Sequence, residues 1–169
     1  LSQVDGMEFV GLRFFTVYGP WGRPDMAPML FARAILSGQE IRIFNNGELS
    51  RDFTYVNDIV EGVVRVLTGP SGGEASSRIY NIGNGSPVKL MDFVSTLEAE
   101  LGATAKKKFV PMQRGDVKAT WADCAKLSAD YGYAPSTSLK QGIREFVAWY
   151  RDYYGTSACP ILAPAFSSF

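Results

Sequence analysis

The chain has 169 residues, 46% of them hydrophobic, which excludes intrinsic disorder and suffices for one compact domain with a sizeable core. Its 17 Lys and Arg residues balance its 17 Asp and Glu residues, so net charge favours neither nucleic acid nor an anionic membrane as a partner, and no apolar run approaches the ~20 residues of a membrane span. The absence of histidine excludes a Ser-His-Asp triad and a histidine-ligated metal within this chain, and the distant Cys124 and Cys159 lack metal spacing.

Two further features concern the setting of the chain. The isolated cysteines and the lack of a signal peptide predict a reducing, cytoplasmic compartment. The first residue is Leu1 rather than Met, so we expect the chain to be a piece of a longer protein.

The first part of the chain predicts a strand, a loop and a helix. Residues 8–15 are expected to form a buried strand, and residues 16–27, rich in Gly and Pro, the loop that follows it. Pro28 suits the first turn of a helix with one apolar face. Open α/β sheets bind ligands at the carboxyl ends of their strands, so this loop is the first candidate site.

A hairpin is expected next. Residues 41–44 (IRIF) form a short strand pattern, and the pair Asn46-Gly47 tolerates the positive φ angles of a tight turn. Residues 49–56 are therefore predicted to pair back on the strand over residues 41–44.

The rest of the chain mixes helices and strands irregularly. Asn57 or Asp58 is expected to cap a helix, residues 71–77 to form a mobile loop, and residues 156–169 an irregular tail. The order predicts a mixed α/β fold over 1–155 rather than a complete doubly wound sheet. The remaining predicted elements are strands over 78–82 and 105–110, and helices over 90–101, from Asp123 to about Tyr131, and from Thr137 or Ser138 onward.

Three arginines are candidates for binding an anion. Arg51 lies in a strand otherwise suited to burial and therefore needs an anionic partner, while Asp52 beside it points to the opposite face. Arg23 lies in the Gly/Pro loop and Arg114 in a polar turn over 111–116. If the three converge, they form a guanidinium cradle for a diphosphate; the alternative for each is a surface arginine or a structural ion pair.

Other side chains can be interpreted as either ligand-binding or structural. Thr16, Tyr18 and Trp21 can hydrogen-bond to or stack on a ligand, or can satisfy the backbone and pack in the core. The run Lys106–Lys108 is most simply a solvated strand edge, so no nucleic acid is expected. No glycine-rich phosphate fingerprint follows a strand, and none of the 8 tyrosines is followed four residues later by lysine.

Several strings of the sequence resemble a known family. FVGLRFFTVYGPWGRPDMAP, IRIFNNGELSRDFTYVNDIVEGVVRVL, IYNIGNGSPVKLMDFVSTLEAELG and GDVKATWAD resemble the carboxyl-terminal half of extended short-chain dehydrogenase/reductases. Among these, GPWGRPDMA is most similar to the UDP-glucuronate 4-epimerase family. The resemblance runs from about Asp5 to Tyr154 and implies the last strands of a Rossmann sheet plus a small α+β nucleotide-sugar domain. The family's glycine fingerprint and catalytic Tyr-x-x-x-Lys would lie before Leu1, so no catalytic residue is expected in this chain.

The resemblance also implies roles for single residues. Phe15 and Val17 would line the nicotinamide side of an NAD pocket, and Thr16 would contact the sugar. Arg23 and Arg51 would neutralise the diphosphate of a UDP-sugar.

Further roles follow from the same resemblance for the uracil and the late turn. The backbone of Arg42 and Phe44 would face the uracil. Related epimerases place an arginine that binds the diphosphate two residues before the Gly-Asp of the turn over 111–116. That position is Gln113 here, so the neighbouring Arg114 is a weaker candidate. Asp116 would help to hold the ribose or the arginines.

The function implied by the resemblance is the substrate-binding half of an NAD-dependent epimerase. It would interconvert UDP-glucuronate and UDP-galacturonate through a 4-keto intermediate, in a family whose members form homodimers through the missing half. A related nucleotide-sugar dehydratase, a UDP-glucuronate decarboxylase and a non-catalytic nucleotide-binding module remain alternatives.

Overall fold

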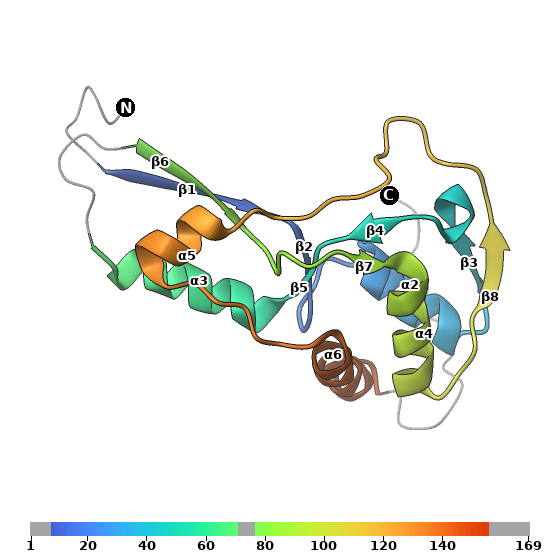
Figure 1. The fold of residues 1–169 in the computed structure, drawn as a ribbon. Helices are drawn as coiled ribbons and strands as arrows, with labels where there is room; N and C mark the ends of the chain where they lie inside the picture. Colours follow the sequence, from blue (N-terminus) through green and yellow to red (C-terminus); the bar gives the residue numbers. More distant parts are fainter. Residues whose placement is uncertain (1–7, 71–76, 156–169) are drawn as a thin grey trace, which may run out of the picture.

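The structure is a computed structural model that describes residues 8–70 and 77–155. Most of the predicted mobile loop and the whole predicted tail over 156–169 lie outside the described residues. The helices and strands form two groups, one at each end of an elongated molecule (Figure 1).

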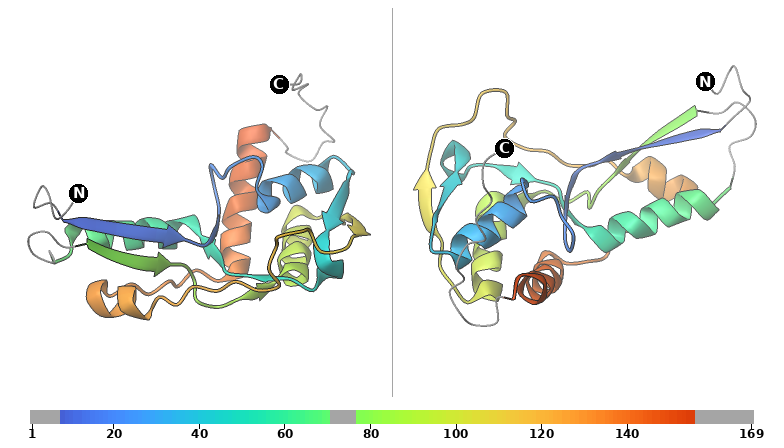
Figure 2. Two further views of the ribbon diagram at one scale, coloured as in Figure 1. Left: turned by 90° about the horizontal axis from the view of Figure 1, so that it is seen from above. Right: turned by 180° about the vertical axis from the view of Figure 1, so that it is seen from behind.

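The first group is built on a pair of parallel strands. Strand β1 (Phe9–Phe14) pairs in parallel with β6 (Ser77–Ile82). Helices α3 (Val56–Thr68) and α5 (Ala125–Tyr131) lie beside this pair in both views of Figure 2. The buried cluster between them consists of Ile59, Tyr80, Ile82, Leu127, Tyr131 and Tyr133.

The second group contains most of the core. Strand β3 (Glu40–Ile43) pairs in parallel with β8 (Lys106–Phe109), and helices α2 (Ala27–Leu36), α4 (Leu90–Leu101) and α6 (Leu139–Tyr154) pack around them. In Figure 2, α6 stands between the two groups. The fully buried side chains of this core are Ala32, Ile43, Phe93, Val94, Leu97, Ile143 and Phe146.

Short strands join the two groups. Strand β2 (Thr16–Tyr18) pairs in parallel with β5 (Phe53–Tyr55), and β4 (Ser50–Arg51) pairs antiparallel with β7 (Val88–Lys89). The fold is therefore mixed α/β with predominantly parallel pairing, as the sequence predicts.

The prediction of a buried first strand is wrong in its burial. Val10 and Leu12 pack against the cluster of the first group, but Phe9 and Phe14 are 37% and 54% exposed. Within the described residues, β6 is the only strand paired with β1, so one edge and one face of β1 lack a covering layer.

The predicted hairpin is also wrong. The predicted pair Asn46-Gly47 does adopt positive φ angles of 51° and 86°, in the 3₁₀ turn η1 (Phe44–Gly47). The chain after the turn nevertheless pairs with other segments: β4 with β7, and β5 with β2. A turn signal fixes the local backbone but not the strand partner, which depends on the distant β8 that pairs with β3.

The loop and cap predictions are corrected in part. The first three residues of the predicted loop over 16–27 form β2. Neither Asn57 nor Asp58 caps α3; the N-cap is Tyr55, with no side-chain cap hydrogen bond, because Asp58 is buried and binds elsewhere. The last helix is predicted to begin at Thr137 or Ser138, and its N-cap is Ser138, whose side chain accepts a hydrogen bond from the amide of Gln141.

Candidate functional site

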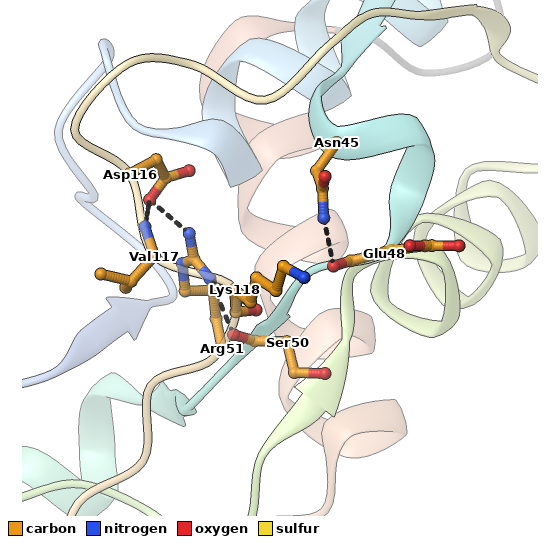
Figure 3. Close-up of polar contacts among 7 residues, drawn as sticks. All are labelled: Asn45, Glu48, Ser50, Arg51, Asp116, Val117 and Lys118. Atoms are coloured by element: carbon orange, nitrogen blue, oxygen red, sulfur yellow. Dashed lines mark hydrogen bonds and ion pairs between the residues drawn. The ribbon is translucent and has the colours of Figure 1, made fainter.

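The guanidinium of Arg51 is anchored by three hydrogen bonds. Its Nη1 donates hydrogen bonds to the carbonyl oxygens of Ser50 at 2.8 Å and Lys118 at 3.3 Å. Its Nη2 donates to Asp116 Oδ1 at 2.6 Å (Figure 3). The Arg51 side chain is 17% exposed, so the predicted anionic partner exists and comes from a segment far along the chain.

The loop that carries Asp116 lies directly beside β4. Ser50 donates from its amide to the carbonyl of Lys118 at 2.9 Å, and Thr120 donates from its amide to the carbonyl of Ser50 at 3.2 Å. Asp116 Oδ1 also accepts from the amide of Val117 at 2.8 Å, which fixes the carboxylate at the start of this stretch. The predicted residues Arg51 and Asp116 are therefore brought together by backbone pairing as well as by charge.

Arg114 and Arg23 are placed differently. Arg114 lies two residues before Asp116 in the same loop, and its side chain is exposed. Arg23 is exposed in the turn between β2 and α2, where its Nη2 pairs with Asp25 Oδ2 at 2.5 Å. Arg23 and Arg51 thus each pair with a different carboxylate, and a convergent three-arginine cradle stays a prediction.

The turn that carries Arg23 is fixed to α6 by aromatic packing. Trp21 has a φ of 61°, which is unusual for a side chain of this size. Its ring lies 5.5 Å from that of Trp149 and 5.0 Å from that of Tyr153. Both partners belong to the last turns of α6, and Trp21 itself is 73% exposed, so it packs at the surface beside α6 rather than in the core.

The residues predicted to face a cofactor and a sugar lie where β1 passes into β2. Phe15, Thr16 and Val17 are all half-buried. The Phe15 amide donates to the carbonyl of Ile82 at 3.2 Å, and Val17 packs against the cluster of the first group. This segment is therefore rigid, and it lies at the carboxyl end of β1, where such sheets bind ligands.

The residues predicted to face the uracil lie at the other end of the molecule. Arg42 is exposed on β3, and Phe44 is half-buried against the core of the second group. The neighbouring lysines of β8 have acidic partners: Lys107 pairs with Glu98 at 2.5 Å, and Lys108 lies 3.6 Å from Glu40.

Sequence reasoning missed the role of Asp52. Its side chain is 0% exposed and accepts hydrogen bonds from three backbone amides and one hydroxyl. The signal was present in the strand pattern, because a carboxylate directed to the buried face of a strand must be hydrogen-bonded there.

The buried tyrosines do not provide a base. Burial raises the pKa of Tyr18, Tyr55 and Tyr133, and burial together with a hydrogen bond to Asp130 raises the pKa of Tyr80 to about 12. They therefore keep their protons at neutral pH. No cluster of His, Cys, Asp and Glu able to hold a metal ion occurs among the described residues.

The fold and the site define a class of protein. The parallel strand pairs and the helices packed on them match the Rossmann-type α/β fold of epimerases and short-chain dehydrogenase/reductases. Residues 1–83 match the sequence model of the NAD dependent epimerase/dehydratase family.

Comparison with individual proteins narrows the resemblance. UDP-glucuronate 4-epimerase 6 of Arabidopsis thaliana is 48% identical over 167 residues, which cover 91% of this chain and 36% of that protein. The structure of UDP-glucuronic acid 4-epimerase from Bacillus cereus, in complex with UDP-glucuronic acid and NAD, matches with a TM-score of 0.77 and 36% identity, over 85% of this chain and 45% of that one. UDP-glucose 4-epimerase of Thermotoga maritima, with UDP-glucose, matches with a TM-score of 0.81 and 26% identity, over 90% of this chain and 49% of that one.

The extent of these matches is itself informative. The chain spans about half the length of the first curated relatives that it matches. The predicted resemblance to UDP-glucuronate 4-epimerases is confirmed, and so is its restriction to part of their length. Within the described residues, no helix is both long and apolar enough to cross a membrane.

Proposed function

We propose that this chain is the substrate-binding half of an NAD-dependent UDP-glucuronate 4-epimerase, which interconverts UDP-glucuronate and UDP-galacturonate through a 4-keto sugar. The observation that carries the proposal is the anchored guanidinium of Arg51 beside Asp116, at the junction of the two groups of elements. The relatives named for this activity support the choice of substrate.

The proposed roles divide the sugar nucleotide among the elements. Arg51 binds the diphosphate, because a guanidinium presents its N–H groups as a fork that matches phosphate oxygens. Arg23, exposed at the turn, supplies a second positive charge, and Arg114 of the late loop a weaker third. Asp116 holds Arg51 or the ribose.

The base and the sugar occupy opposite ends of this arrangement. The backbone of Arg42 and Phe44 faces the uracil, and Thr16 contacts the sugar at the end of β1. Binding free energy gained on the remote UDP then positions C4 of the sugar for reaction.

The fit to NAD is partial. Phe15 and Val17 are half-buried beside Thr16, so they suit the nicotinamide wall of a pocket. The sequence has no glycine-rich turn for the pyrophosphate, so the other wall must come from a second, Rossmann half. When bound, NAD would take the C4 hydride of the sugar and return it to the opposite face. This chain's own residues bind and orient, and the Tyr-x-x-x-Lys pair that moves the proton would lie in the other half.

The proposal is tested on the intact enzyme, meaning these residues together with that Rossmann half. Incubation with UDP-glucuronate and NAD is expected to yield UDP-galacturonate, detected by chromatography and mass spectrometry with sugar standards. UDP-xylose would identify a decarboxylase, a stable 4-keto sugar a dehydratase, and binding without turnover a non-catalytic module; each result would overturn the proposal. A homodimer formed through the other half, a cytoplasmic location and the absence of nucleic-acid binding stay predictions.

A further inference from the structure

Asp52 is the point at which three segments distant in sequence meet. The carboxylate is fully buried, and all of its contacts come from β5 or from two loops. Its hydrogen-bond donors are Thr54 Oγ1 at 2.9 Å and the backbone amides of Asn84 at 2.8 Å, Gly85 at 2.9 Å and Ala122 at 2.7 Å.

The backbone of the same residue reaches the proposed site on two sides. The carbonyl of Asp52 accepts a hydrogen bond from the amide of Thr16 at 3.1 Å, and its amide nitrogen is linked covalently to Arg51. Ala122 ends the stretch that begins at Asp116, the ion-pair partner of Arg51. Asp52 thus links Arg51, proposed to bind the diphosphate, to Thr16, proposed to contact the sugar, and to the loop that carries Asp116.

We propose that Asp52 is a positioning residue of the sugar-nucleotide site, which holds the Asp116 loop against β4 and so orients the Arg51 guanidinium toward the diphosphate. The inference rests on the proposed function of Arg51. Asp52 itself is buried and touches no ligand, so its effect on binding must pass through Arg51.

The packing around the carboxylate leaves no room for adjustment. A Cβ atom at Gly83 would lie 2.7 Å from the Cβ of Ala122 and 3.1 Å from Asp52 Oδ2. The loop before Asn84 therefore approaches Asp52 as closely as a residue without a side chain allows.

The chemistry of the four hydrogen bonds makes asparagine a sharp probe. Oδ1 accepts from the amide of Asn84, and Oδ2 accepts from the amides of Gly85 and Ala122. An asparagine side chain has one acceptor oxygen and one NH₂ group. In either orientation, its NH₂ group would face at least one backbone N–H. Asp52→Asn therefore preserves the shape of the side chain but removes at least one of the hydrogen bonds that hold the two loops.

The test compares Asp52→Asn with a matched control in the intact enzyme. The control residue is Asp58, in the first turn of α3, whose side chain is also buried, at 4% exposed. It accepts hydrogen bonds from the amides of Ser136 and Thr137 and from Thr137 Oγ1. Asp52→Asn is expected to raise KM for UDP-glucuronate about tenfold with kcat changed less than about twofold. Asp58→Asn is expected to lower the melting temperature and leave KM unchanged. Equal changes of KM in both variants would refute the positioning role.

A double-mutant cycle shows whether Asp52 acts through Arg51. In an Arg51→Ala background, adding Asp52→Asn is expected to change KM by less than about twofold, because the side chain that it positions is already gone. A full tenfold effect in that background would overturn the inference. If Asp52→Asn does not fold, Thr54→Val removes one of the four hydrogen bonds, and a KM raised about two- to threefold is expected; an unchanged KM would count against the inference.

The two proposals fail differently. Calorimetry on the wild-type intact enzyme measures UDP-glucuronate binding directly, and no binding would refute the proposed function. Normal binding by the wild type and by Asp52→Asn alike would refute only the positioning role.

Discussion

At the scale of residues, Arg51 combines fixed contacts with free hydrogen-bonding capacity. An arginine carries five N–H donors. Three of them are used by the carbonyls of Ser50 and Lys118 and by the carboxylate of Asp116. Within the described residues, two donors remain for a ligand oxygen, so a phosphate can bind without displacing the contacts that hold the guanidinium.

Arg51→Ala in the intact enzyme should therefore weaken UDP-sugar binding and leave NAD binding unchanged. A charge-assisted hydrogen bond contributes about 1.5–3 kcal/mol, so more than a tenfold rise in Kd is expected. Isothermal titration calorimetry with each ligand measures both effects. Arg65→Ala, which removes an exposed pair with Glu61 on α3, is the control and should change neither. Equal loss of both ligands, or of neither, would exclude the diphosphate role.

At the scale of elements, α6 is fixed across β2 and β5 by very close packing. Tyr18 donates to the carbonyl of Leu139 at 3.4 Å, and Tyr55 donates to Glu145 Oε2 at 2.7 Å. The two tyrosine rings reach the helix at Gly142, where no side chain intervenes. Because Trp21 packs on the last turns of the same helix, α6 positions both β2 and the turn that follows it.

Gly142→Ala should destabilise the protein although alanine favours helices. The added Cβ would lie 2.2 Å from the hydroxyl oxygen of Tyr18, and overpacking of this kind costs about 1–3 kcal/mol. Urea unfolding followed by circular dichroism measures the loss. Gly11→Ala is the control, since its Cβ would make an ordinary contact of 3.6 Å with Ile79. Similar free energies of unfolding for the two variants would contradict the close packing of α6.

At the scale of the whole molecule, the two ends differ in how well they are covered. The group built on β1 and β6 exposes apolar side chains on both its strands and α3, among them Phe14, Ile79 and Leu67, at 54%, 54% and 78%. The proposed Rossmann half would cover such a surface. The other group contains the larger buried core, and the buried tyrosines of both groups contribute to the pH dependence of stability.

The free energy of unfolding should fall as the pH rises from 10 to 12. The ordinary pKa of tyrosine is 10.0, and burial and Asp130 raise that of Tyr80 to about 12. The unfolded chain then loses this proton at a lower pH than the folded protein does, so this contribution is complete below pH 10 and is lost as the pH approaches 12. Tyr80→Phe should reduce the slope, and Tyr153→Phe, at an exposed tyrosine, should not. Urea unfolding at several pH values measures the slopes; identical slopes for both variants would contradict the assignment.

The purified 169-residue chain should show no epimerase turnover. The proposed residues of this chain bind and orient, and none of its eight tyrosines is paired with a lysine four residues later. The assay is conversion of UDP-glucuronate in the presence of NAD, with the intact enzyme as positive control. Turnover above background by the chain alone would place the chemistry within these residues.

Local signals in the sequence determined the helices, the family and the need of Arg51 for an anionic partner. Helix periodicity and the Ser138 cap depend on residues a few positions apart, so they can be read without a partner segment. The motif GPWGRPDMA gave the resemblance that the comparisons confirm. Only the tertiary structure decided that β3 pairs with β8, that Asp116 is the partner of Arg51, and that Asp52 binds the backbone amides of two distant loops. Each of these contacts joins residues at least 32 positions apart, and no local pattern specifies which of many distant donors or strands will meet.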